Sequence, residues 1–527
     1  MASSVYKKVG IASLIMTASI FASRLIGVFR EMAIAYTGGA SGSVDAYQVA
    51  FIIPEILNHV VASGFLSVTF IPIFSHYLAA GEEDRGWELF SVIMTVFGGI
   101  LVLLTALAFV LTPHLVRLLA PGLTDPGRFH SAVRMTRIIM PAQIFFFAGG
   151  LFMAVQFAKE RFAVPALAPL IYNLGIIAGG LLGGRWLGME GFAWGVLAGA
   201  FIGNCALQYV GARRIGMRFR FLLRWRHPDL KRYILLTIPL MLGLTMTFVT
   251  EIFLKYFGSH LPPGSIAALN YALRIMYIVV ALFGQAVGVA SYPFLTRLAA
   301  EGKVGELNRL LNSTLRYLAL VIPLSALFMA LRHETVLVLF QRGRFDAAAT
   351  AITSRLLIFL MLGAFAFAVQ TVVVRGFYAT QNTLLPALFS TAAAVISLPI
   401  YVYGLRYFGA DGVALAVSLS AILQVVMLFN LWNRRSGNAG SRSVYLFYLR
   451  VIGLSIPLGL LLERLKIFLH TVIDTTTLTG CLVTGTITLA VFLSLLIAAA
   501  YALRLEEVIR LGKKLAARLG SGKTHGP

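Results

Sequence analysis

Long apolar runs recur along the whole chain, with short polar segments between them. Runs of about 20 apolar residues are typical of membrane-spanning helices, because a helix of that length crosses the hydrocarbon layer. The pattern predicts about fourteen such helices, which are expected at 10–29, 43–78, 89–112, 132–158, 164–184, 191–212, 233–257, 266–296, 310–331, 351–378, 384–404, 411–433, 444–463 and 478–503. We therefore expect an all-α integral membrane protein, and an even number of spans places both termini on the same side.

Two predicted spans, 43–78 and 266–296, are longer than a bilayer requires. The first contains Pro54 and Pro72, each of which removes a helical hydrogen bond. We expect bends in these spans, packed inside a bundle or lining a cavity where the freed carbonyls find partners.

An internal repeat appears at an offset of 221 residues. At this spacing RFAVPAL (161–167) aligns with NTLLPAL (382–388), and LGMEGFAWGV (187–196) aligns with FGADGVALAV (408–417). Six predicted spans separate corresponding points, so both copies enter the membrane in the same orientation, as in transporters built from two parallel repeats with a pseudo-two-fold axis. The predicted organisation is a six-helix lobe at 1–220, a second six-helix lobe at 221–436, two extra helices at 437–503 and a basic cytoplasmic tail at 504–527.

Composition supports a membrane protein: 59% of the residues are hydrophobic, 12% are charged and the mean hydropathy is +0.85. The net charge of +23 does not indicate nucleic-acid binding, because the basic residues lie in short loops between apolar runs. Loops on the side of the termini carry roughly 26 Lys and Arg against about 10 on the other side, which predicts cytoplasmic termini. The segment 504–520 is expected either to lie on an anionic leaflet or to be a solvated charged tail.

No motif for covalent or nucleotide chemistry is present. Cys205 and Cys481 both lie in apolar runs, which excludes a disulfide framework and gives no metal-ligand spacing. The chain has no GxxxxGK[ST] loop, zinc helix or nucleophile elbow. We expect a transporter without a cofactor, driven by an ion gradient or by the membrane potential, and not an enzyme.

Three arginines fall in or at the ends of predicted spans. Arg24 and Arg274 are expected at similar depth, one from each lobe, and Arg30 at the outer end of the first span. An arginine near the bilayer centre costs about 2.5–3.5 kcal/mol on insertion scales, so it needs a wet cavity, an anion or a carboxylate partner. Arg30 has Glu31 beside it as an ordinary partner. Guanidinium groups from two lobes suit phosphate or pyrophosphate, so we predict an anionic head group as the cargo.

The acidic candidates for gating or ion coupling are Asp45, Glu55 and Glu251, and Asp45 and Glu251 each have an ordinary alternative. Asp45 opens a predicted helix, where an anion has a capping role. Glu251 has Lys255 four residues later, the spacing of a helical ion pair. His59 lies on the helical face of Glu55 and is expected either to titrate near neutral pH or to be a hydrogen-bonded core histidine.

The stretch from Ser23 to Phe51, SRLIGVFREMAIAYTGGASGSVDAYQVAF, followed by IPEIL and GFLSVTFIPIF, resembles the start of the MurJ (MviN) family of lipid II flippases. That family belongs to the multidrug/oligosaccharidyl-lipid/polysaccharide exporter superfamily. Further segments in family order include ALNYALRIMYIVVALFGQAVGVASYPFLTRLA (268–299) and RGFYATQNTLLPA (375–387). The resemblance covers close to the whole chain, including the two extra C-terminal helices.

The resemblance implies translocation of an undecaprenyl-pyrophosphate-linked peptidoglycan precursor, lipid II, to the outer leaflet of the bacterial inner membrane by alternating access. It implies that Arg24, Arg30 and Arg274 line a central cavity, that Asp45 lies near the outer gate, and that the extra helices form a groove for the lipid tail. It also implies cell-wall synthesis proteins as partners.

The chain departs from the family pattern in the head-group region. Asn58 and His59 stand where the family commonly has a basic pair, Ser63 stands where a glutamate is usual, and Leu273 replaces the expected acidic residue. Asn58 and His59 are nevertheless expected to contribute to substrate binding. These departures leave open a flippase for another polyprenyl-pyrophosphate-linked oligosaccharide. A cation or multidrug exporter would need cavity carboxylates in place of arginines, and a membrane polymerase would need a larger loop outside the bilayer.

Overall fold

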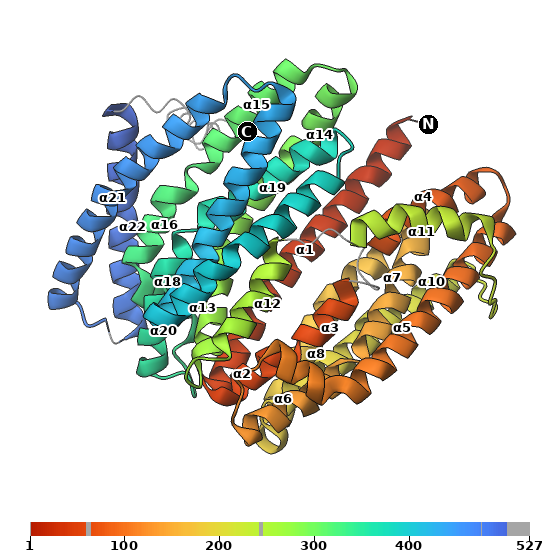
Figure 1. Cartoon of the computed structure of the whole chain (residues 1–527), viewed down its shortest axis with the longest axis horizontal. Helices are drawn as coiled ribbons and strands as arrows, with labels where there is room; N and C mark the ends of the chain where they lie inside the picture. Colours follow the sequence, from red (N-terminus) through yellow and green to blue (C-terminus); the bar gives the residue numbers. More distant parts are fainter. Residues whose placement is uncertain (1, 60–64, 242–245, 476, 503–527) are drawn as a thin grey trace, which may run out of the picture. The chain divides into compact units, whose positions relative to one another are not determined.

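The computed structural model describes residues 2–59, 65–241, 246–475 and 477–502, and within these ranges the chain is helical with short connections and no strand (Figure 1). Ten helical segments of the described residues are long and apolar enough to cross a membrane, and some of them combine two or three consecutive helices. The number is eleven when the bent pair α18 (Ala347–Met361) and α19 (Ala364–Ala379) is counted as one span. The predicted all-α, multi-span architecture is confirmed. Ser63 and the segment 504–520, both discussed above, lie outside the described residues.

The described helices of the first half of the chain are α1 (Ala2–Gly38), α2 (Gly42–Ala50), α3 (Ile52–Leu57), α4 (Phe65–Ala79), α5 (Glu83–Leu119), α6 (Pro126–Ile139), α7 (Ala142–Ala158), α8 (Ala163–Leu187), α9 (Glu190–Gly199), the π-helix η2 (Ala200–Ala206), α10 (Leu207–Arg214), α11 (Pro228–Met241) and α12 (Met246–Gly258). Those of the second half are α13 (Ser265–Val280), the π-helix η3 (Ala281–Gln285), α14 (Ala286–Ala300), α15 (Val304–Leu318), α16 (Val321–Ala330), α17 (Arg332–Phe340), α18, α19, α20 (Leu384–Ser436), α21 (Ser441–Val472) and α22 (Leu478–Ala502).

Three places account for the difference between the fourteen predicted spans and the eleven found among the described residues. Predicted span 43–78 corresponds to α2, α3 and α4, and predicted span 233–257 corresponds to α11 and α12. Helix α20 covers two predicted spans and is interrupted at Gly409, whose φ of 56° and ψ of −128° are not helical. Glycine is suited to this backbone conformation because it has no Cβ to clash at positive φ. Phe51 separates α2 from α3 in the predicted span 43–78, and the bends expected from Pro54 and Pro72 stay a prediction.

The chain forms two compact units. Unit 1 comprises Met1–Leu244, Glu251–Ala267 and Arg342–Asp346, and unit 2 comprises Thr245–Thr250, Ala268–Gln341 and Ala347–Pro527. Each unit therefore includes short segments that are distant in sequence from the rest of it. The lobe boundaries expected from the repeat stay a prediction.

Helices α8 and α9 of unit 1 pack backbone against backbone. Both carry glycines at intervals of four residues, and a Cβ on Gly179 would lie 2.5 Å from the Cα of Gly195. A Cβ on Gly175 would lie 2.6 Å from the Cα of Gly199. Such small-residue stripes allow membrane helices to approach closely, so the glycines fix this contact. On the other side of α8 lies α1, which carries Arg24 and Arg30.

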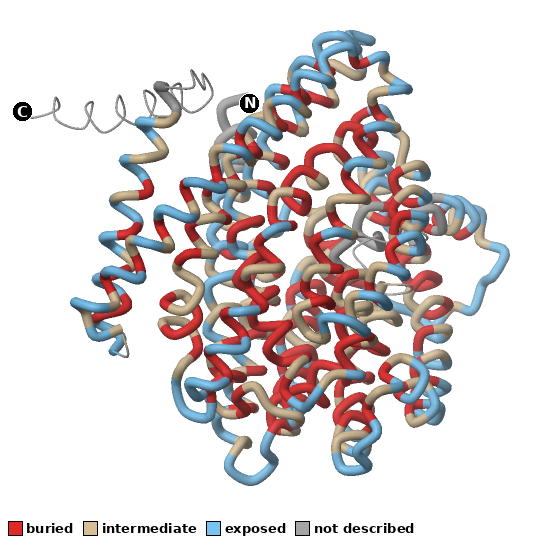
Figure 2. The backbone as a smooth tube through the Cα atoms, turned by 60° about the vertical axis from the view of Figure 1, so that its left-hand side comes forward, coloured by how far each residue is buried: buried red, intermediate tan, exposed pale blue. Residues whose placement is uncertain are grey.

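The last two helices of unit 2 expose much of their apolar surface. In the most apolar 18-residue stretch of α21, only 22% of the residues are buried. The share is the same for α22, and it is 61% for α20. Figure 2 shows many exposed and half-buried positions along the helices leading to the C-terminus. Apolar helix faces of this length suit contact with lipid.

Candidate functional site

Arg30 is held between α1 and α8 of unit 1. Its Nη1 donates to Oδ1 of Asn173 at 3.0 Å, and its Nη2 donates to Oε1 of Glu31 at 2.6 Å. The Asn173 amide in turn donates to Ser23 Oγ at 3.3 Å. Glu31 is buried. Its ion pair with Arg30, which the sequence offered as the ordinary alternative to ligand binding, is present. This network fixes the direction of the Arg30 guanidinium.

Arg24 directly follows Ser23 on α1 and its side chain is exposed. Within the part of the chain that the structure describes, the Arg24 guanidinium has no hydrogen bond or ion pair. A cation without a partner on an apolar membrane helix needs water or an anion. Arg24 is therefore available to bind an anionic ligand.

Arg274 lies on α13 and is half-buried, with the fully buried side chains of Leu273 and Ile275 on either side. It belongs to unit 2, whereas Arg24 belongs to unit 1. The pairing of these two arginines in one clamp stays a prediction.

Asp45 on α2 does not cap its own helix. Its carboxylate is buried and accepts the backbone N–H of Gly264 at 2.6 Å and that of Ala267 at 2.8 Å. These amides lie at the N-terminus of α13, where free N–H groups and the helix dipole favour an anion. The capping role considered from the sequence is therefore directed at a helix that is distant along the chain.

Glu55 on α3 forms an ion pair with Lys255 on α12, with 2.9 Å between Oε2 and Nζ. The Lys255 side chain is only 1% exposed. The Lys255 ammonium therefore has a partner on another helix, and the pairing with Glu251 that the sequence suggested stays a prediction. Glu251 is half-buried on α12.

Asn58 and His59 follow α3, and both are half-buried. They lie within four residues of Glu55, so the three residues named from the sequence do share one segment of unit 1.

Arg375 on α19 is a polar side chain that the sequence analysis did not single out. It is half-buried, and its Nη1 is a buried atom with no hydrogen-bond partner among the described residues. Gly288 of α14 lies against it, because a Cβ at that position would be 3.1 Å from the Arg375 Cζ. The glycine provides space for the guanidinium. An arginine inside a predicted apolar span was the available signal.

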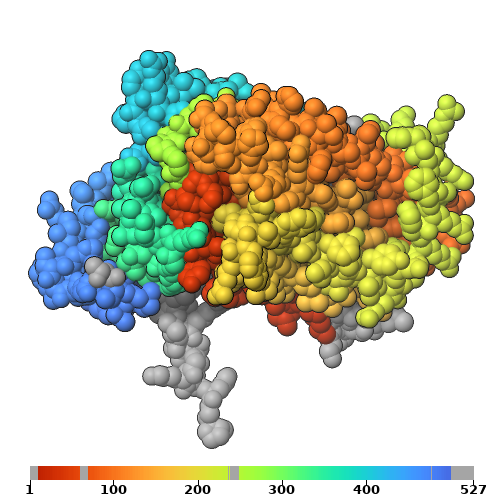
Figure 3. Space-filling model, turned by 90° about the horizontal axis from the view of Figure 1, so that it is seen from below, coloured from red at the N-terminus to blue at the C-terminus, as the bar shows by residue number. Residues whose placement is uncertain are grey.

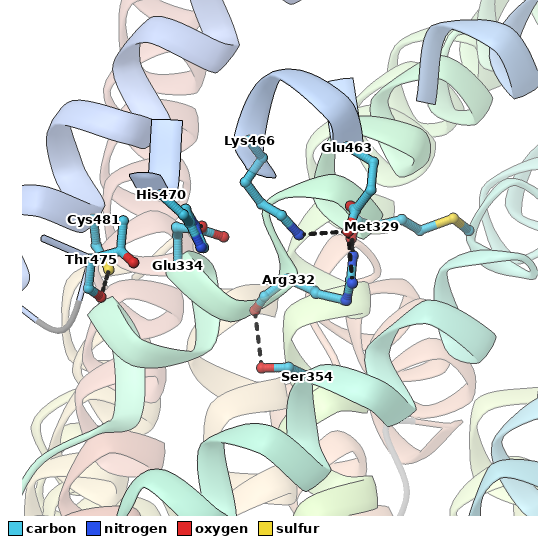
Figure 4. A network of polar contacts seen from close by, with 9 residues as sticks. All are labelled: Met329, Arg332, Glu334, Ser354, Glu463, Lys466, His470, Thr475 and Cys481. Carbon is cyan, nitrogen blue, oxygen red and sulfur yellow. Dashed lines mark hydrogen bonds and ion pairs between the residues drawn. The ribbon is translucent and has the colours of Figure 1, made fainter. Parts of the chain in front are cut away.

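A second polar network of unit 2 joins α17 to α21 (Figure 4). Arg332 donates two hydrogen bonds to Glu463, at 2.8 and 2.9 Å, and Lys466 donates to the same carboxylate at 2.8 Å. His470 contacts the buried Glu334 at 2.6 Å. The sequence predicted that the first extra helix ends at residue 463, before Lys466 and His470. Helix α21 instead continues to Val472, beyond the predicted end at 463, and pairs its charges with α17.

Comparison with known proteins gives a consistent family. The family model described as Lipid II flippase MurJ matches residues 34–501. The Lipid II flippase MurJ of Burkholderia cenocepacia is 28% identical over 446 residues, which cover 83% of this chain and 86% of that relative. The probable lipid II flippase MurJ of Rhizobium tropici is 26% identical over 422 residues, 78% of this chain and 79% of that relative.

Two solved structures show a similar fold. A lipid II flippase MurJ in an inward closed conformation has a TM-score of 0.76 and 22% identity, and covers 93% of this chain and 99% of its own. An inward-facing multidrug resistance transporter of the MATE family, in the MOP superfamily, has a TM-score of 0.63 and 14% identity over 79% of this chain and 94% of its own. At these identities the likeness concerns the fold.

Proposed function

Because the chain belongs to the MurJ family of lipid II flippases, we propose that it moves lipid II, the polyprenyl-pyrophosphate-linked peptidoglycan precursor, from the inner to the outer leaflet. The match to the family model over residues 34–501 carries this proposal. The chain is a multi-pass membrane transporter, not an enzyme.

The arginines are the proposed binding groups for the pyrophosphate. Arg24 is exposed and without a described partner, and Arg375 has a buried nitrogen without one. Guanidinium groups bind phosphate oxygens through paired, charge-assisted hydrogen bonds. Arg274 is the third proposed binding group. Arg30 is already bonded to Glu31 and Asn173, so we propose that it exchanges one of these partners for the ligand.

We propose alternating access between a six-helix lobe at 1–220 and another at 221–436, as in other transporters with parallel repeats. The exposed apolar faces of α21 and α22 are the proposed contact surface for the polyprenyl tail. Asn58 and His59 are proposed to contact the sugar or peptide of the head group.

Transport of an anionic head group responds to the membrane potential, at about 2.3 kcal/mol per elementary charge and 100 mV. Asp45, Glu55 and Glu251 are the proposed coupling or gate residues. Asp45 and Glu55 are bonded to backbone amides and to Lys255, so a coupling step requires these contacts to open.

The same two contacts argue against a cation exporter, because carboxylates bonded to N–H groups and to a lysine are not available to bind a cationic drug. A flippase for another polyprenyl-pyrophosphate-linked oligosaccharide remains the alternative. It is favoured by Asn58 and His59, which stand where the family resemblance implies a basic pair.

We place the protein in the bacterial cytoplasmic membrane with both termini in the cytoplasm, as the Lys and Arg distribution favours. Its proposed partners are cell-wall synthesis proteins that use the exported lipid.

The test is exposure of lipid II on the outer face of bacteria depleted of their own flippase and supplied with this chain. Arg24→Ala and Arg274→Ala are expected to lower exposure by about tenfold or more, since a hydrogen bond to a charged group contributes about 1.5–3 kcal/mol. Arg434→Ala, at an exposed position near the end of α20, is the control. If the well-inserted intact chain does not restore exposure while it restores export of another polyprenyl-linked glycan, the alternative cargo is correct.

A further inference from the structure

The segment 217–226, MRFRFLLRWR, connects α10 to α11 and lies along the start of α5 in unit 1. It forms no helix. The backbone N–H of Arg220 donates to Ser91 Oγ at 3.1 Å, and that of Leu222 donates to Thr95 Oγ1 at 3.3 Å. Two amide groups two residues apart therefore point to the same helix, which is the arrangement of an extended chain.

The side chains of Arg218, Leu222 and Arg224 also face α5. Arg218 pairs with Asp84 at 2.5 Å, Arg224 pairs with Glu88, and Leu222 packs against the apolar core. The four α5 residues that receive the segment, at positions 84, 88, 91 and 95, are three or four residues apart and share one helical face. The contacts thus fix both the position and the register of the segment.

From Phe219 onward, the side chains of odd number point away from α5. They are Phe219, Phe221, Leu223 and Trp225, and they are 47%, 78%, 58% and 58% exposed. In Figure 3, the yellow-green atoms of this part of the chain lie at the right-hand edge of the view, and no other described part of the chain covers them there. Four large apolar side chains in a row are costly in water, so this row requires a cover.

The charges around the row indicate what covers it. Arg220 and Arg226 are exposed and have no ion pair among the described residues, and Arg214, Lys231 and Arg232 add further exposed cations nearby. The segment also lies on the first three turns of α5, a helix apolar enough to span the membrane. Aromatic and basic side chains at the end of a spanning helix are typical of the boundary between hydrocarbon and head groups.

We propose that segment 217–226 is a binding surface for anionic phospholipids of the leaflet at the start of α5, with the odd-numbered row inserted among the acyl chains and the free arginines on the phosphates. This surface is separate from the transport arginines and does not depend on which lipid is transported. It anchors the connection between α10 and α11 at the membrane boundary.

The test uses the full-length chain with Cys205 and Cys481 replaced by alanine and one new cysteine that carries a bimane fluorophore. The labelled positions are Phe221→Cys on the exposed row, Leu222→Cys on the α5 side, and Ala80→Cys at an exposed position before α5 as the aqueous control. Vesicles contain either phosphatidylcholine alone or a mixture with phosphatidylglycerol, with doxyl-labelled lipid or aqueous iodide as quencher.

We expect the label at 221 to be quenched by doxyl lipid at least about threefold more than the label at 80, and to be protected from iodide. The label at 222 should be protected from iodide by α5. Doxyl-labelled phosphatidylglycerol should quench the label at 221 about twice as strongly as doxyl-labelled phosphatidylcholine. Arg220→Gln with Arg226→Gln should remove this preference, whereas Arg434→Gln with Arg435→Gln, which removes the same charge elsewhere, should preserve it.

Iodide quenching at 221 equal to that at 80 in both vesicles would place the row in water and overturn the proposal. Protection from both quenchers, with crosslinking of position 221 to a second copy or to another protein, would overturn it in favour of a protein interface. A lipid contact without preference for phosphatidylglycerol would overturn the role of the arginines.

Discussion

Asp45 accepts the backbone N–H of Gly264 at 2.6 Å although 219 positions separate the two residues along the chain. The second oxygen of the same carboxylate accepts the N–H of Ala267. One buried side chain on α2 therefore satisfies two amides at the start of α13, the helix that carries Arg274. The start of α13 is thus anchored to α2 within unit 1.

We predict that Asp45→Ala and Asp45→Asn both destabilise the protein and lower lipid II exposure. Alanine removes both acceptors, and hydrogen bonds to a charged group contribute about 1.5–3 kcal/mol each. Asparagine keeps one acceptor oxygen but directs its NH₂ group at the other amide. Thermal unfolding in lipid nanodiscs measures the effect, with Ser43→Ala at an exposed position of α2 as control. Equal stability of Asp45→Ala and the control would contradict the capping role.

Apolar periodicity was sufficient to predict the helical class and the approximate position of the spans, because burial in lipid and helix length act locally along the chain. It could not show that α2 and α3 are separate helices, since the break at Phe51 depends on packing as well as on Pro54. It also ended α21 too early, at 463. A charged residue in an apolar run is normally a loop signal, and here Arg332 of α17 compensates the charge of Glu463.

For the candidate site, the sequence identified residue types but not their partners. The Arg30–Glu31 pair was visible as neighbours, whereas Asn173, which is 143 positions from Arg30, was not. Helical spacing indicated Glu251 as a partner of Lys255, but it could not indicate Glu55, which reaches Lys255 through tertiary packing. Contacts of this kind depend on which helices become neighbours, and no local pattern contains that information.

We predict that Glu55→Gln destabilises the protein more than Lys255→Met. Removal of one partner of a buried ion pair costs about 3–5 kcal/mol, because it leaves the other charge uncompensated. Glu55 is 32% exposed and Lys255 is buried, so water can screen the carboxylate but not the ammonium.

A double-mutant cycle in nanodiscs measures this coupling through thermal unfolding. The double variant should lose less stability than the two single variants together, because neither charge is left alone. Additive losses would show that the two side chains do not interact.

We predict that Arg375→Ala lowers lipid II exposure without lowering the thermal stability. The buried Nη1 has no described partner, so the unliganded protein loses no hydrogen bond from that atom when the side chain is removed. A bound phosphate would lose a charge-assisted contact, which corresponds to a decrease of about tenfold or more. Arg355→Ala, which breaks an ion pair with Asp411, is the control.

Gly288→Ala provides an independent check of the same position. The added Cβ would press on the guanidinium, so transport should decrease while Arg375 is still present. Normal lipid II exposure in both Arg375→Ala and Gly288→Ala would exclude Arg375 from the binding site.

The contact between α17 and α21 allows a prediction on the extra helices. Arg332 binds both oxygens of Glu463, and neither side chain is exposed by more than 29%. We expect Glu463→Gln to loosen α21, because Arg332 and Lys466 then face each other without the shared carboxylate. Hydrogen exchange of the α21 amides should increase near residue 463 and remain unchanged near its start. Arg464→Gln, which alters an exposed neighbour, is the matched control.

Lipid II exposure should fall along with this loosening of α21 if α21 supports the lipid tail, since a mobile helix cannot hold an apolar contact surface in place. Faster exchange with normal lipid II exposure would confine the network to a structural role and would separate α21 from transport.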